Sequence, residues 1–226
     1  MGQPSIRVGH DPDFPPFGWR AGDESRGRLI ELVAAALTRA RVKPRFVPTP
    51  LPRLDAALES GEIDAIAFHG VVPERKIKFA YSAPLIASGG AWFLPDTVVW
   101  TDDNPPDGAA VATPERGPLV GVIERRYPKV RMVKVADYPA ALDAALGGKA
   151  DAAALNMHVG AYLVRRDFAG RFHLPKRPFL PIDMAFCCLA GEHDELLSAI
   201  DGALAALRKE GVTADLERKY SGARVA

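Results

Sequence analysis

Arg75 is the residue whose type and position most clearly suggest a binding chemistry. It follows an apolar run at residues 63–68, which we predict to be a buried strand. A guanidinium near the end of such a strand can hold a small carboxylate through two parallel N–H···O bonds, which the ammonium group of lysine cannot form. Asp11 and Phe14 lie on a loop after an earlier predicted strand. There a carboxylate could meet a cationic ligand group, and a ring could form an apolar wall.

Each of these candidates has a plainer structural alternative. Arg75 could be a surface side chain beside Glu74, Phe14 a core aromatic ring, and Asp11 a turn-forming residue before a proline. Trp19 and Leu51 are further candidates for the walls of a site, although both residue types often serve only in packing.

Strand and helix patterns alternate along the first part of the chain, which predicts parallel pairing and an α/β fold. The loop at residues 11–17 contains three prolines, which remove backbone donors. The elements expected in this part are strands at 6–8, 46–47 and 63–68 and helices at 29–41 and 51–58.

A turn-rich connector at residues 95–108 precedes a second run of the same alternation. We expect strands at 109–113, 131–135, 151–155 and 182–190 and helices at 118–126, 138–146, 159–166, 195–210 and 213–220. In each half of the chain a helix ends at glycine and the next strand opens with Asp-Ala, at Asp64 and at Asp151. The two halves therefore look like related β-α-β-α-β units.

The composition excludes several classes of protein. The 226 residues carry a formal net charge of +1, which argues against a general nucleic-acid binder. No apolar run reaches the ~18 residues of a membrane-spanning helix, and no leader peptide precedes the first predicted strand, so we expect a cytoplasmic protein or a mature domain without its leader. Cys187 and Cys188 are adjacent, which disfavours a mutual disulfide, and we expect both to be core residues without a metal.

The chain resembles family 3 of the bacterial extracellular solute-binding proteins, of the periplasmic amino-acid-binding type. Seven short motifs occur in the order and at the spacing of that family. They cover almost the whole chain and lie at residues 6–17, 58–65, 73–75, 81–84, 146–152 and 191–196, with a closing motif at 207–211 and 219–222.

The resemblance implies a type II periplasmic-binding-protein fold, in which two α/β lobes are joined by two hinge strands with a ligand cleft between them. Lobe 1 would comprise residues 1–94 plus 185–226 and lobe 2 residues 95–184, with crossings near 91–95 and 184–188. Such proteins close on their ligand by hinge motion. The expected molecule is a periplasmic monomer that needs no cofactor or metal and delivers its ligand to the permease of an ABC-type importer.

The family pattern adds binding candidates to those found from the residues themselves. Phe68, His69 and Gly70 follow the third strand, and Gly70 stands where the family often has a ligand-binding serine or threonine. Arg116 and Gly117 lie at a helix start that favours an anionic group. Asn156 replaces an aspartate that binds the ligand's ammonium group in amino-acid binders of the family, so it keeps an acceptor without the charge.

These departures suggest an anionic or weakly cationic ligand, either a small carboxylate or an atypical amino-acid derivative. An ordinary α-amino acid stays open as an alternative. We expect no catalysis, but two other functions stay open. One is the ligand-sensing module of a membrane receptor. The other is an enzyme similar to cyclohexadienyl dehydratase, for which Asp11, His69 and Glu115 are conceivable acids or bases without a fixed pairing.

Overall fold

The computed structural model describes residues 3–100, 104–115 and 119–221. It divides into two compact units: unit 1 comprises Met1–Ala87 and Ile182–Ala226, and unit 2 comprises Ser88–Pro181. Both units have a mixed α/β fold, as the sequence predicts.

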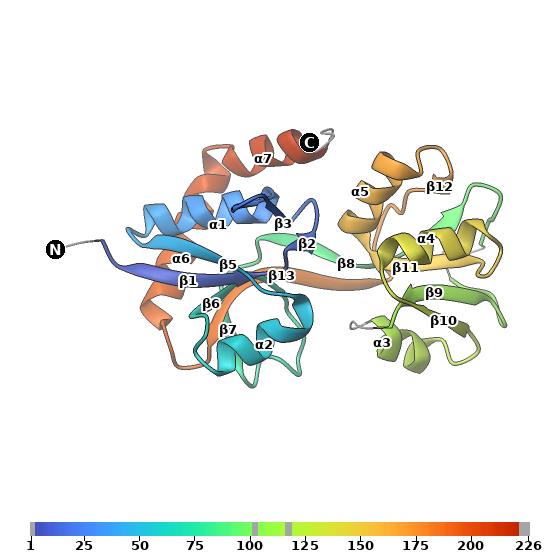
Figure 1. The fold of residues 1–226 in the computed structure, drawn as a ribbon, viewed down its shortest axis with the longest axis horizontal. Coiled ribbons are helices and arrows are strands. Elements are labelled where there is room, and N and C mark those ends of the chain that lie inside the picture. The colour runs from blue at the N-terminus through green and yellow to red at the C-terminus, as the bar shows by residue number, and fades with distance from the viewer. Residues whose placement is uncertain (1–2, 101–103, 116–118, 222–226) are drawn as a thin grey trace. The chain divides into compact units, whose positions relative to one another are not determined.

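Unit 1 begins with a strand that lies between two parallel neighbours. Strand β1 (Ser5–His10) pairs with β5 (Lys43–Pro48) on one side and with β6 (Ala65–Gly70) on the other. Helices α1 (Arg28–Arg39) and α2 (Leu51–Glu59) connect these strands and lie on opposite faces of them (Figure 1). Their apolar faces bury Leu29, Leu37, Leu54 and Leu58 against the sheet.

The rest of unit 1 extends this sheet and covers one of its faces. Strand β7 (Phe79–Tyr81) pairs antiparallel with the last long strand, as β6 does. A small separate sheet is formed by β2 (Asp13–Phe14), β3 (Gly18–Ala21) and β4 (Glu24–Arg26). Helices α6 (Asp194–Lys209) and α7 (Val212–Ser221) end the chain and pack on the α1 side (Figure 1).

Unit 2 repeats the parallel arrangement around a second central strand. Strand β9 (Ala110–Pro114) lies between β10 (Arg131–Val135) and β11 (Ala152–Asn156). Its helices are α3 (Leu119–Arg126), α4 (Tyr138–Leu146) and α5 (Met157–Asp167). The short strand β12 (Phe172–His173) borders this unit, and its core includes Val111, Ile123, Ala152 and the stacked rings of Trp92 and Phe179.

Two long strands carry the chain from one unit to the other. Strand β8 (Ile86–Pro95) leaves unit 1 between Ala87 and Ser88, and β13 (Leu180–Leu189) returns between Pro181 and Ile182. The crossings expected at residues 91–95 and 184–188 lie within these strands. The lobe boundaries drawn from the sequence stay a prediction.

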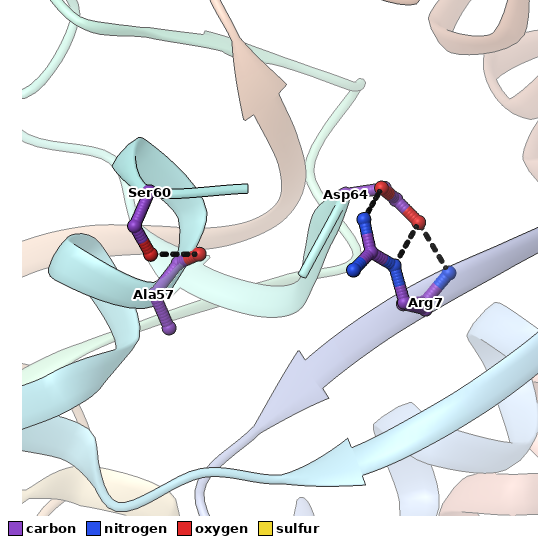
Figure 2. A network of polar contacts seen from close by, with 4 residues as sticks. All are labelled: Arg7, Ala57, Ser60 and Asp64. Carbon is purple, nitrogen blue, oxygen red and sulfur yellow. Dashed lines mark hydrogen bonds and ion pairs between the residues drawn. The ribbon is translucent and has the colours of Figure 1, made fainter. Parts of the chain in front are cut away.

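The Asp-Ala motif in each half has one structural explanation. Asp64 accepts a hydrogen bond from the backbone N–H of Arg7 at 2.8 Å, and its own N–H donates to the Arg7 carbonyl at 2.9 Å. Asp151 makes the same exchange with Ala110, at 2.7 and 2.8 Å. Each aspartate thus fixes the register of its strand against the central strand of its unit. Asp64 also forms a two-pronged ion pair with the Arg7 side chain (Figure 2).

The prediction that both cysteines are core residues is confirmed, and two further findings concern the described residues. Cys187 and Cys188 are buried free thiols, and burial raises the pKa of Cys188 to about 12, so neither is a reactive thiolate at neutral pH. None of the described helices is both long and apolar enough to span a bilayer. In the same residues no three His, Cys, Asp or Glu side chains gather as metal ligands.

Candidate functional site

The candidate residues of unit 1 lie at one edge of its sheet because their strands are parallel neighbours. Asp11 follows β1, Leu51 follows the end of β5 by way of a short turn, and Gly70 ends β6. These strands are adjacent in the order β6-β1-β5, so their carboxyl ends meet at the same edge. In open α/β sheets this edge is where ligands bind.

Arg75 lies on the turn that follows β6, and its side chain points back toward the end of that strand. Nη1 is 3.5 Å from the Gly70 carbonyl oxygen, and Nε is 3.5 Å from Oδ2 of Asp55. Both contacts are long, so the guanidinium is oriented without being tightly bound. A guanidinium has five N–H donors. Nη2 has no partner among the residues that the structure describes, which leaves this side of the group available for a carboxylate.

His69 is a buried neighbour of this arginine rather than a solvated side chain. The ring is 2% exposed, and Nε2 is 2.9 Å from Oδ1 of Asp55. The ring N–H is not well aligned on that oxygen, so the pair is a close polar contact and not a hydrogen bond. Burial lowers the pKa of His69 more than Asp55 raises it, and Arg75 lowers it further. The imidazole is therefore neutral at pH 7.

Asp55 contacts both His69 and Arg75 and was not among the candidates from the sequence. Its pKa is lowered chiefly by the contact with His69 and also by the charges of Arg75 and Lys78, against the opposing effect of burial. Asp55 is therefore ionised at neutral pH. Leu51 and Asp55 are four residues apart in α2 and so share a helical face, a spacing that could have identified Asp55.

Phe14 and Phe68 form an aromatic pair near the same edge of the sheet. Their rings stack with centroids 6.4 Å apart and planes 16° apart, and Phe17 packs against both. Phe68 is 4% exposed, whereas Phe14 is only half-buried. Gly18 is required beneath them, because a Cβ there would lie 2.7 Å from the Phe68 ring. Phe14 thus offers an apolar surface, and Phe68 supports it.

Asp11 also performs the turn-forming role that we considered as its alternative. Its Oδ1 accepts a hydrogen bond from the backbone N–H of Asp13 at 3.1 Å. Burial raises the pKa of Asp11, and no basic side chain contributes to the shift. His10, which is fully buried, donates from Nδ1 to the Asp11 carbonyl at 2.9 Å and contacts the Ser25 hydroxyl through Nε2 at 2.7 Å. This loop is consequently well fixed.

Trp19 and Leu51 differ in their surroundings. Trp19 packs edge-on against Tyr220 of α7, with ring centroids 5.8 Å apart, which is a packing role. Leu51 is 39% exposed at the first position of α2, one turn before Asp55. Leu51 therefore remains available to a ligand, while Trp19 joins the loop region to the C-terminal helix.

In unit 2 the structure describes one of the three candidates. Asn156 ends β11 and caps α5: its Oδ1 accepts hydrogen bonds from the backbone N–H groups of His158 and Val159 at 3.0 and 3.3 Å and from the Ser88 hydroxyl at 3.2 Å. The side-chain amide nitrogen has no partner among the described residues. The Asn156 oxygen is therefore engaged within the protein and its amide nitrogen is available, and a role of Asn156 in ligand binding stays a prediction. Arg116 and Gly117 lie outside the described residues.

An α/β fold in two units connected by two strands is that of periplasmic binding domains, and comparison with known proteins agrees with it. The model of bacterial extracellular solute-binding proteins, family 3, matches residues 6–223, and the chain belongs to this family.

Among individual proteins, the chain is 27% identical to the virulence sensor protein BvgS of Bordetella pertussis over 221 residues. The match covers 95% of this chain but only 18% of the sensor. The crystal structure of the BvgS periplasmic VFT2 domain superposes with a TM-score of 0.80 at 22% identity, covering 96% of this chain and 94% of that domain.

A second similar structure is that of an ancestral amino-acid-binding protein described as a precursor of cyclohexadienyl dehydratase. Its TM-score is 0.78 at 24% identity, and it covers 96% of this chain and 95% of its own. At this level of identity the two crystal structures establish the fold and leave the ligand open.

Proposed function

We propose that this chain is a ligand-sensing module of a periplasmic receptor and that it binds a small carboxylate through Arg75. The observation that carries the proposal is the free Nη2 side of Arg75 at the carboxyl edge of three parallel strands. A carboxylate matches this planar group in shape and charge. The half-buried face of Phe14 would hold the apolar part of the ligand.

The surroundings of Arg75 also favour a particular kind of ligand. Asp11 and Asp55 are two candidates for an ammonium partner among the described residues of unit 1. Asp55 already contacts Arg75 and His69, and the pKa of Asp11 is raised by burial, which disfavours its charged form. We therefore infer that an anionic or neutral polar ligand fits better than a cationic one.

The role as a sensor rests on the similarity to BvgS along 95% of this chain. Capture of a ligand for an ABC-type importer is the second candidate, supported by membership of a family named for solute binding. The coding sequence and its neighbours distinguish the two. A transmembrane and kinase region in the same reading frame supports the sensor, and an adjacent permease gene supports the importer.

We propose no catalytic activity for the site. The buried His69 is in contact with Asp55, and the pKa of His69 is lowered, so it is a poor proton donor at pH 7. Catalytic activity can be tested directly on the purified protein. Incubation with the bound acid, followed by NMR of the mixture, should return the acid unchanged, whereas a dehydrated product would contradict the proposal.

Arg75→Lys tests the carboxylate site by keeping the positive charge while removing the planar fork. We expect calorimetric titration with small carboxylates and unmodified α-amino acids to show binding of a carboxylate, weakened about tenfold or more in this variant, since a charged hydrogen-bonded pair contributes ~1.5–3 kcal/mol. Arg53→Lys is the matched control, because Arg53 lies on the surface of α2 and pairs with Glu62.

Two results would contradict the proposal. Equal affinities of the wild type and Arg75→Lys would remove Arg75 from the site. Submicromolar binding of an unmodified α-amino acid alone would show that the loss of the ammonium partner does not determine the ligand.

A further inference from the structure

Asp55 lies where it can act on any anion that Arg75 holds. Its carboxylate is on α2, whereas the two residues that it contacts belong to the end of β6 and to the turn after it. One oxygen is 2.9 Å from His69 Nε2, and the other is 3.5 Å from Arg75 Nε. The Asp55 carboxylate therefore connects α2 to the turn that bears Arg75, through a contact with the guanidinium itself.

The contacts with Asp55 and Gly70 orient the guanidinium of Arg75, and the carboxylate of Asp55 also offsets its positive charge. Asp55 approaches Nε and the Gly70 carbonyl approaches Nη1, so the two protein contacts lie on opposite sides of Nη2. Nη2 is thereby left free among the described residues. An arginine held in this way is oriented before the ligand arrives, which reduces the entropy lost on binding.

The charges around Arg75 nearly cancel. Asp55 offsets Arg75, the neighbouring Lys78 pairs with Glu59 at 2.7 Å, and the buried His69 carries no charge at neutral pH. A bound monocarboxylate would leave the cluster with one net negative charge. A dicarboxylate would place a second negative charge within several ångströms of Asp55, where charges still interact appreciably because the site is partly shielded from water.

We propose that Asp55 is a positioning and charge-selecting residue, which orients Arg75 and makes the site prefer monocarboxylates to dicarboxylates. The proposal rests on the carboxylate site proposed above. Beyond that site, monocarboxylates are the class of acid admitted, and Asp55 is the side chain that disfavours dicarboxylates.

Succinamate and succinate provide matched probes, because an amide in the first replaces a carboxylate in the second. Asp55→Asn removes the negative charge but keeps an oxygen that can accept from Arg75 Nε. At pH 7.5 we expect NMR titration to show that wild type prefers succinamate. In Asp55→Asn the affinity for succinate should rise relative to that for succinamate by about threefold to tenfold, the range that Coulomb's law allows at this separation.

Glu62→Gln is the control, since it removes one negative charge at a partly exposed residue that pairs with Arg53, outside the charged cluster around Arg75. The ratio of the two affinities should not change in this variant. If Asp55 had only a structural role, Asp55→Asn would weaken the binding of both probes equally. An unchanged ratio of the succinate and succinamate affinities in Asp55→Asn would therefore overturn the proposal.

A second measurement needs no ligand. If Asp55 and Arg75 interact as described, the melting-temperature shifts of Asp55→Asn and Arg75→Gln should not add in the double variant. Additive shifts would overturn the proposal even if binding is normal. Absence of binding of either probe to wild type at 50 mM would overturn the carboxylate site itself, and with it the charge selection. The two failures are thus distinguishable.

Discussion

Two aspartates show how much structure a single side chain can specify in this protein. Asp64 and Asp151 each precede a strand and accept the backbone N–H of a residue on the neighbouring strand. A slip of one residue would turn every side chain of the strand to the other face. The repeated Asp-Ala motif therefore encodes strand register in both units. Its occurrence at equivalent positions in the two halves is explained by this structural role, without any role in ligand binding.

Asp64→Asn should lower the free energy of unfolding by about 1 kcal/mol at pH 7, because a charged acceptor of three donors is replaced by a neutral one that is partly exposed. The pKa of Asp64 is lowered in the folded protein, mainly by Arg7. Its stabilisation is therefore present above the unfolded-state pKa of about 3.9 and lost as the pH falls through the folded-state pKa.

Urea denaturation at pH 7 and at a series of acidic pH values measures this difference. The gap between wild type and Asp64→Asn should narrow as the pH falls below about 4. Asp107→Asn is the control, since its pair with Lys129 is exposed and should contribute little. A gap that stays constant with pH would show that the charge of Asp64 is not what stabilises the fold.

At the level of single residues, the sequence predicted only some of the side chains of the candidate site. The position of Arg75 after an apolar strand identified it, and its environment agrees with a ligand-binding role that stays a prediction. Asp55 was missed because a lone aspartate in a helix resembles a surface residue until the fold brings it to His69 and Arg75. Asn156 was interpreted by its chemistry alone, whereas capping of α5 occupies its oxygen.

At the scale of elements, the loop after β1 is fastened to the start of α1. The Pro16 carbonyl accepts from Arg28 N–H at 2.8 Å, and the Phe17 carbonyl accepts from Leu29 N–H at 3.0 Å. These bonds satisfy helix donors that no side chain caps, because the residue at that position is Gly27. The loop that bears Phe14 therefore forms part of the helix terminus.

Gly27→Ala should break this arrangement. Gly27 has φ of 134°, and a Cβ there would lie 2.4 Å from the Phe17 carbonyl oxygen. We expect the variant to lose about 2–3 kcal/mol of stability in urea denaturation. Gly22→Ala is the control: Gly22 also has positive φ, at 60°, but its Cβ would have no neighbour within 4 Å. Equal losses in the two variants would show that backbone conformation alone, without the loop contact, accounts for the effect.

Most of the helices and long strands followed from the sequence, because their apolar periodicity and glycine stops are strong. The predicted ranges 131–135 and 138–146 are those of β10 and α4. The β3–β4 hairpin was missed since its residues are mostly polar, although a two-residue Gly-Asp turn between Ala21 and Glu24 is a recognisable signal. Strand β7 is too short for periodicity to show.

At the scale of the whole molecule, the sequence order of two similar units predicted the architecture because each β-α-β-α-β run forms three parallel neighbouring strands. The antiparallel strands β8 and β13 could not be paired from periodicity, since a run of apolar residues does not reveal its neighbour. The chain passes between the units twice, through β8 and through β13.

Ligand binding should raise the melting temperature of the whole chain. A ligand that binds only the folded protein stabilises it by about 2.7 kcal/mol at 100 times its dissociation constant. For a chain of this size we expect succinamate at that concentration to raise the melting temperature by roughly 5–10 °C. Thermal scans of Arg75→Gln should show no such rise, because the carboxylate loses its partner, whereas Arg53→Gln should respond as wild type does. A rise of the same size in Arg75→Gln would place the binding site elsewhere in the chain.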